Sequence, residues 1–140
     1  MNEEIINYEA EGWYLLNEED DKQQAKEAFQ QAIDEGNEGA YCGLASASEN
    51  SEERVIYLRK AALAGRLDAM WMLQSETNDV SIEKMAWLKI AADNDYMPDA
   101  IDEFECYKLS EEQLKEVDIQ RKKFLKQIEE SGFKLSEGYL

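Results

Sequence analysis

The residue types that perform most enzyme chemistry are scarce in this chain of 140 residues. It contains no histidine, which excludes histidine general acid–base catalysis, Ser–His and Cys–His nucleophilic catalysis, and metal sites with histidine ligands. Cys42 and Cys106 are too few for a four-thiolate zinc site. We expect two unpaired thiols on helices, with a disulfide between them as the alternative. The sequence also has neither a glycine loop for phosphate nor a dinucleotide fingerprint.

Acidic clusters are abundant, yet their spacing is not that of a metal site. A calcium loop starting at residue 93 needs an oxygen-bearing side chain, Gly and Glu where the sequence has Met97, Pro98 and Phe104. A loop starting at residue 17 has Lys22 in place of its Gly and Ala28 in place of its Glu. With 32 acids, pairs of carboxylates at the separation used by glycosidases arise by chance. We therefore predict a non-enzymatic protein with no catalytic residue, no metal and no cofactor.

The charge of the chain is strongly negative and unevenly distributed. Residues 1–53 hold 15 of the 32 acids but 2 of the 15 bases, a net charge of −13, against −4 for the remainder. Such a surface repels phosphate backbones and anionic lipids, so we predict no direct nucleic-acid binding and no membrane binding. An acidic field speeds the encounter with a positive surface, which favours a basic protein partner. Solubility alone is the alternative explanation of the charge.

No apolar run approaches the 18 or so residues of a membrane span, and the start MNEEII lacks the basic and apolar regions of a signal peptide. We therefore expect a cytoplasmic location.

Apolar residues recur at intervals of three and four nearly throughout, which indicates an all-α protein. We predict eight helices, over residues 3–17, 20–35, 38–47, 51–64, 67–76, 80–93, 98–108 and 111–131. Gly36 and Gly65 follow apolar stretches, where a left-handed residue closes a helix, and Asn94 is the next best residue for that role. Ser110 to Gln113 has the sequence of a capping box, which opens the last long helix.

Three stretches repeat along the chain: AFQQAIDEGNEGAYCGL (28–44), YLRKAALAGRLDAMWML (57–73) and WLKIAADNDYMPDAIDEF (87–104). Ala32, Ala61 and Ala91 are equivalent. A second alanine, at 40, 69 or 100, precedes a large apolar residue by four positions. Stacked helix pairs need this combination, because the small residue permits close approach and the large one fills the gap above it.

The second stretch resembles the Sel-one-like repeat, a relative of the tetratricopeptide helix-turn-helix, and residues 13–29 resemble a divergent first unit. The match is carried by Tyr57, Ala61, Ala62, Gly65, Ala69 and Leu73. The units are shorter than those of the family, whose helix-joining loop is usually longer and rich in glycine. The resemblance implies a right-handed α-solenoid of about four repeats, at 3–35, 38–64, 67–93 and 98–131, in a single domain of residues 1–140. The last helix would cap the stack, and the tail 132–140 is either loose or docked through Phe133, Leu135 and Tyr139.

The aromatic residues suggest a binding groove. Trp71 lies about 200° around its helix from both Ala69 and Leu73, so we expect it to face a concave groove, with packing against a neighbouring unit as the alternative. Trp87 aligns with Tyr57 and is predicted to be core. An aromatic ring flanked by acids suits a Lys or Arg side chain. The predicted partner-binding residues are Trp13, Asp68, Trp71, Ser75, Asp99 and Asp102.

These expectations together predict an interaction module that binds a basic protein or peptide. One use is that of an immunity protein, which inhibits a basic toxin such as a nuclease. The alternatives are a general adaptor, as the resemblance implies, or a self-associating scaffold in a bacterial complex.

Overall fold

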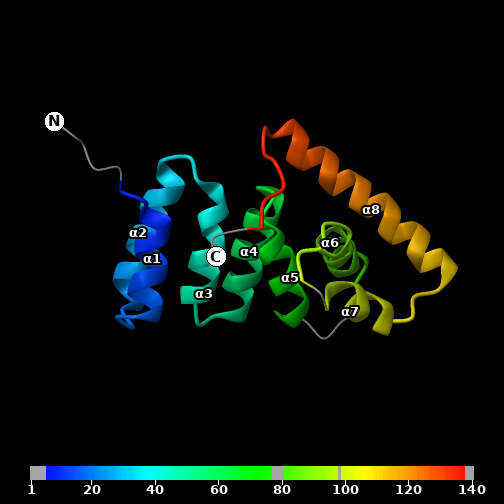
Figure 1. Ribbon diagram of the computed structural model, residues 1–140, viewed down its shortest axis with the longest axis horizontal. Coiled ribbons are helices and arrows are strands. Elements are labelled where there is room, and N and C mark those ends of the chain that lie inside the picture. The colour runs from blue at the N-terminus through cyan, green and yellow to red at the C-terminus, as the bar shows by residue number, and fades with distance from the viewer. Residues whose placement is uncertain (1–5, 77–80, 98, 138–140) are drawn as a thin grey trace.

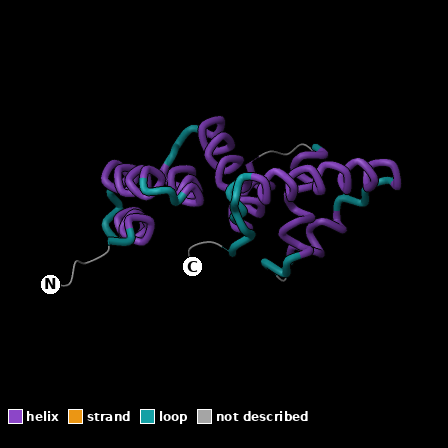
Figure 2. Tube along the Cα trace, turned by 90° about the horizontal axis from the view of Figure 1, so that it is seen from above, coloured by secondary structure: helices purple, strands orange, loops and turns teal. Residues whose placement is uncertain are grey.

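A computed structural model describes residues 6–76, 81–97 and 99–137, which are helical except for short joints and the C-terminal tail (Figures 1 and 2). The helices are α1 (Tyr8–Asn17), α2 (Lys22–Asp34), the 3₁₀ turn η1 (Glu38–Ala40), α3 (Tyr41–Ala47), α4 (Ser51–Leu63), α5 (Leu67–Glu76), α6 (Ile82–Asp93), α7 (Ala100–Cys106) and α8 (Glu111–Glu130). The all-α prediction is confirmed. The predicted helix 38–47 divides into η1 and α3. Of the predicted helix 3–17, residues 3–5 lie outside the described residues, and α1 begins at Tyr8, after an Asn7 side chain that caps it.

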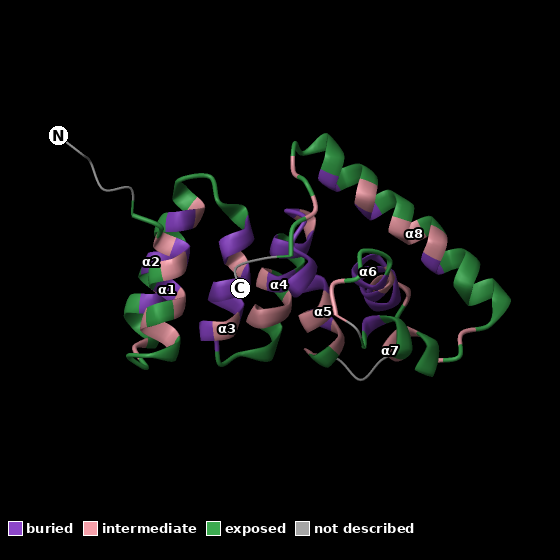
Figure 3. Ribbon diagram, viewed as in Figure 1, coloured by how far each residue is buried: buried purple, intermediate pink, exposed green. Residues whose placement is uncertain are grey.

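Each helix packs on the next along the chain, so the molecule is elongated, with α1 and α2 at one end (Figure 1). The last helix, α8, departs from this order and runs back over α6 to reach α4. It buries Val117, Phe124 and Ile128, and the Phe124 ring stacks on Trp87 with centroids 3.7 Å apart. Trp87 is 1% exposed, which confirms it as core. The remaining surface of α8 is largely exposed, whereas α6 is buried nearly throughout (Figure 3). The Ser110 capping box is also confirmed.

The three aligned stretches fold into the same helix-ending joint. The backbone N–H of Asn37, Arg66 and Tyr96 donates to the carbonyl of Ala32, Ala61 and Ala91 respectively. The residue before each donor is left-handed, with φ of 100° at Gly36, 89° at Gly65 and 53° at Asp95. The left-handed residue of the third joint is therefore Asp95, one position beyond the predicted Asn94. The second alanines, at 40, 69 and 100, are completely buried.

The C-terminal tail docks on the joint between α4 and α5. The Ser136 N–H donates to the Gly65 carbonyl, and the Leu67 N–H donates to the Ser136 carbonyl, both at 2.8 Å. A Cβ on Gly65 would collide with the Lys134 carbonyl, so this glycine permits both the left-handed turn and the close approach of the tail. Phe133 and Leu135 pack on the main core, which agrees with the docked one of the two alternatives for the tail, while Tyr139 lies outside the described residues.

A smaller core joins α1, α2 and α3 around the fully buried Phe29 ring. Gly12 of α1 and Gly43 of α3 lie against this ring, and a Cβ on either glycine would overlap it. The Trp13 ring meets Phe29 edge to face, with centroids 5.2 Å apart. This contact sets the position of Trp13. None of the helices in the described ranges is long and apolar enough to cross a membrane.

Candidate functional site

The first helices of successive pairs enclose a cavity of about 330 Å³, here named the Trp13–Tyr96 cavity. Three helices each contribute two residues one turn apart, and the joint before α7 contributes a tyrosine. The lining residues are Trp13 and Asn17 of α1, Cys42 and Ser46 of α3, Asp68 and Met72 of α5, and Tyr96. Because i and i+4 lie on one face of a helix, α1, α3 and α5 all turn a single face to this space.

Trp13 is held from two sides. Its ring edge packs on Phe29, and its indole Nε1 donates to Glu9 Oε2 at 3.4 Å. A side chain with its indole N–H already bonded offers the cavity an aromatic surface with little freedom to move. That arrangement reduces the conformational entropy that a ligand must restrict on binding.

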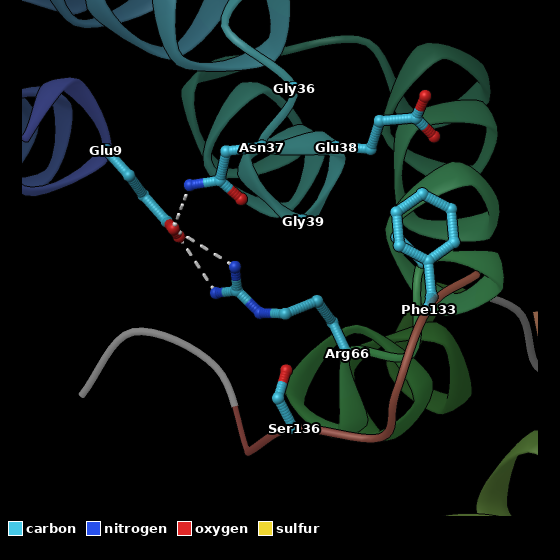
Figure 4. Close-up of a pocket in the computed structure, with 9 residues that line it drawn as sticks. Glu9, Gly36, Asn37, Glu38, Gly39, Arg66, Phe133 and Ser136 are labelled. Carbon is cyan, nitrogen blue, oxygen red and sulfur yellow. Dashed lines mark hydrogen bonds and ion pairs between the residues drawn. The ribbon is translucent and has the colours of Figure 1, made fainter.

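An ionic network, here named the Arg66 network, lies beside the cavity and consists of the buried charged residues Glu9, Arg66 and Asp68 and the exposed Asn37. Figure 4 shows the contacts of Glu9 with Asn37 and Arg66. Arg66 Nη2 is 2.9 Å from Glu9 Oε2 and 3.1 Å from Asp68 Oδ2, and Arg66 Nε donates to Asp68 Oδ1 at 3.2 Å. Asn37 Nδ2 donates to Glu9 Oε1 at 3.0 Å. The three charged residues are 5 to 7% exposed. The network therefore ties α1 to α5, to the joint between α2 and η1 and to the joint between α4 and α5, and its net charge is −1.

Burial works against the charge of Arg66, but its hydrogen bonds to Glu9 and Asp68 outweigh that effect and raise the pKa of the guanidinium above its ordinary value. Arg66 is therefore a fixed cation. Because Asp68 and Glu9 together carry one more charge than Arg66, an unbalanced negative charge remains next to the cavity.

The other titratable groups of the cavity respond to this negative charge. Burial raises the pKa of the Cys42 thiol, which donates to Asp68 Oδ2 at 3.6 Å, and the Asp68 charge raises it further, against a weaker opposing effect of Arg66. Burial also raises the pKa of Tyr96, and the charge of Asp68 raises it further. Cys42 is thus a protonated, unreactive thiol at neutral pH. Both cysteines are free, as expected, and Cys106 is exposed.

The structure brings two of the six predicted partner-binding residues, Trp13 and Asp68, to the cavity. Asp68 is not the exposed carboxylate that we expected, because it is 7% exposed and bonded to Arg66. Trp71 is half-buried against the main core and does not line the cavity. Ser75 is exposed, and its hydroxyl donates to the Met72 carbonyl at 2.9 Å.

Asp99 and Asp102 are exposed at the start of α7, away from the cavity lining. On α5 the residues that line the cavity are Asp68 and Met72, whereas Trp71, the neighbour of Met72, packs on the main core. α5 packs between α4 and α6, and Met72 Sδ lies 3.6 Å from Cys42 Sγ of α3.

A second cavity, of about 260 Å³, lies on the Glu9 and Arg66 side of the network. Its other walls come from the joint between α2 and α3 and from the docked tail, including Phe133 and Ser136 (Figure 4). The Arg66 network thus borders two cavities, with Asp68 in the lining of the first and Glu9 and Arg66 in that of the second. In the second cavity, the polar atoms of Glu9 and Arg66 bond to each other, and none of the described residues that line it is a tryptophan or a tyrosine.

No protein-family profile, curated protein or solved structure matches this chain. Among the described residues, no three Cys, Asp or Glu side chains are grouped closely enough to hold a metal ion.

Proposed function

We propose that this protein is a non-enzymatic binding module that captures a basic protein through the acidic surface of α1 and α2. It is a single domain of residues 1–140, a right-handed solenoid of about four helix pairs of the Sel-one-like kind. The joint repeated at Gly36, Gly65 and Asp95 supports the repeat assignment. Repeat stacks present extended concave surfaces, which suit the binding of another protein.

The observation that carries this proposal is the uncompensated acidic surface of the first two helices and their joints. Eight acids here are exposed: Glu11, Glu18, Glu19, Asp20, Glu27, Asp34, Glu35 and Glu38. Within the described residues, the one acid of α1 or α2 that forms an ion pair is Glu9, which is buried. An exposed field of one sign accelerates encounter with a surface of the opposite sign.

The test begins with affinity capture from the source cells and continues with the association kinetics of the captured partner. Neutralising Glu11, Glu18 and Glu27 to Gln should slow association and weaken its salt dependence, since steering charges are screened within about 8 Å at physiological ionic strength. The matched control neutralises Glu105, Glu116 and Glu129, which are equally exposed but lie on α7 and α8. If the two triple variants change the association rate equally, the acidic residues have only a general role in solubility.

Two narrower uses can be separated genetically. As an immunity protein in the cytoplasm, the chain would protect cells that express a basic toxin encoded beside it, whereas an adaptor would give no such rescue. Direct binding of nucleic acid or membrane is not part of this proposal, because the acidic surface repels both.

A self-associating scaffold is favoured by a different observation, the exposed apolar residues Ile101, Leu114 and Ile119 of α7 and α8. Light scattering over a range of protein concentrations tests it. A monomer at the highest concentration would exclude this use.

A further inference from the structure

We propose that the Trp13–Tyr96 cavity is the receptor for one basic side chain, a Lys or an Arg, projecting from the partner. This inference rests on the proposed function and deepens it, because it replaces a general acidic surface with one defined recognition site.

The dimensions and walls of the cavity suit a single long side chain. Its volume of about 330 Å³ is at the lower end of the range for ligand pockets, roughly 300–1,000 Å³. Trp13, Met72 and Tyr96 give it largely apolar walls. Lys and Arg carry alkyl stems that are buried readily against apolar surface while their charged ends reach a polar group. The cavity offers both kinds of contact.

The charge beside the cavity selects a cation. The Arg66 network has a net charge of −1, and its Asp68 carboxylate lines the cavity. Asp68 Oδ2 accepts a hydrogen bond from Arg66 Nη2 at 3.1 Å and a second one from the Cys42 thiol at 3.6 Å. Cys42 lines the cavity, and a thiol is a weak donor. An ammonium or guanidinium group can therefore replace that contact with a stronger, charge-assisted one. Trp13 and Tyr96 line the cavity, and aromatic rings attract cations through their faces.

The rim of the cavity is polar and open to solvent. Asn17 is exposed at the end of α1, and Ser46 is half-exposed on α3. The Ser46 hydroxyl donates to the Cys42 carbonyl at 3.2 Å, which leaves its oxygen able to accept a further hydrogen bond. A side chain entering at this rim would meet acceptors first and the aromatic walls next.

The direct test uses blocked tripeptides as probes, Gly-Lys-Gly and Gly-Arg-Gly, against Gly-norleucine-Gly, whose side chain lacks the charge. Binding is followed by the indole N–H resonance of Trp13, which the Trp13→Phe variant identifies. We expect saturable shifts with the Lys or Arg peptide, and at least about threefold weaker binding of the norleucine peptide, the fold-change that cation–π attraction provides at a partly exposed site. Equal affinity for norleucine, or no shift at Trp13 with any peptide, would overturn the proposal.

Matched variants locate the site. Ser46→Lys places a competing cation in the cavity and should abolish peptide binding, whereas Ser75→Lys adds the same charge at an exposed position outside it and should leave binding unchanged. Asn17→Lys, at an exposed rim position, repeats the test should Ser46→Lys fail to fold. Loss of binding in Ser75→Lys as well would place the site on the other stripe of α5 and refute the proposal.

The same variants distinguish this inference from the proposed function. If Ser46→Lys and Asn17→Lys still bind the basic partner with salt-dependent association, the acidic surface suffices, and the cavity is not the receptor. If neither the acidic-surface variant nor the cavity variants change capture, both proposals fail together.

Discussion

Replacing Arg66 with methionine should be the most destabilising change available in the Arg66 network. The substitution keeps an unbranched side chain but removes the one cation between two carboxylates. Glu9 and Asp68 are 5% and 7% exposed, so water cannot readily take the place of the guanidinium. Breaking a buried ion pair by removing one partner costs about 3–5 kcal/mol. Since a domain of this size has a free energy of unfolding of about 5–15 kcal/mol, Arg66→Met should remove a large share of that stability.

Removing all three charges together should cost less than removing one. In the triple variant Glu9→Gln/Arg66→Met/Asp68→Asn, no unpaired charge is buried. The new amide oxygens can still accept the hydrogen bonds of Asn37 and of the Ala69 backbone N–H, which the carboxylates accept now. Replacing a complete buried ionic group with neutral residues is often close to neutral in free energy. We therefore expect the triple variant to recover more than half of the loss caused by Arg66→Met.

Urea unfolding followed by circular dichroism provides the measurement, with the slope of the transition as a second readout. A loss below about 1 kcal/mol in Arg66→Met would refute the reasoning, because it would mean that the two carboxylates are solvated or differently paired. A triple variant less stable than Arg66→Met would refute it as well. A reduced slope would indicate that α1 and α2, which have their own core around Phe29, unfold separately once the network is broken.

The remaining predictions concern the aromatic residues, the small core and the buried thiol. Trp87→Ala should cost about 3–5 kcal/mol, as for other fully buried large aromatics, and Trp71→Ala should cost less than half as much because Trp71 is half-buried; equal losses in a urea titration would make Trp71 a core residue. Gly43→Ala should destabilise by about 1–3 kcal/mol through overpacking, because the new Cβ would overlap the Phe29 ring, and an unchanged melting temperature would contradict that geometry. Because burial raises the pKa of the Cys42 thiol, the unfolded chain loses this proton at a lower pH than the folded protein does. The contribution of this thiol to the free energy of unfolding should therefore be fully present below about pH 9 and fall at higher pH by up to about 1.4 kcal/mol per pH unit. Cys42→Ala should flatten that alkaline decline relative to the wild-type protein, and parallel curves would show that the tyrosines alone cause it.

The elements and joints of this fold could be predicted from the sequence because the forces that define them are local. A left-handed residue at the end of a helix is favoured at Gly36 and Gly65 whatever the rest of the chain does. The misplacement by one residue at Asn94 has a local cause too, since aspartate can adopt the left-handed conformation almost as asparagine does. Here the spacing from Ala91, the same as in the glycine joints, makes Asp95 the residue that turns.

The candidate site was only partly predictable because it depends on helix rotation and on long-range pairing. A rotation of about 100°, one residue on a helix, separates Trp71 from Met72, and the packing of α5 between two neighbours decides which of them faces α3. Nothing in the local sequence of Glu9 indicates that it pairs with a residue 57 positions away. The pairing of Glu9 with Arg66 can therefore be recognised only in the folded structure, where α1 lies next to the joint before α5.

Equivalent positions of the three aligned stretches make different contacts around this site. The joint donor is Asn37 in one unit, Arg66 in the next and Tyr96 in the third. Asn37 and Arg66 bond to Glu9, and Tyr96 lines the Trp13–Tyr96 cavity. The stretch 28–44 has Gly39 where the stretch 57–73 has Asp68, and a Cβ at Gly39 would collide with the Arg66 side chain. Thus one unit supplies the space for the guanidinium, and the next supplies the guanidinium together with the carboxylate that binds it.

A stack held together only by alanine and leucine contacts would not need this asymmetry, because each unit could use the same residues. The asymmetry instead builds a charged network that borders a cavity between units, at the cost of burying three charges. Buried charges of this kind contribute little net stability compared with apolar residues of similar size. Under the function proposed above, these charges serve the recognition of a positively charged side chain at the aromatic-walled cavity rather than the stability of the fold.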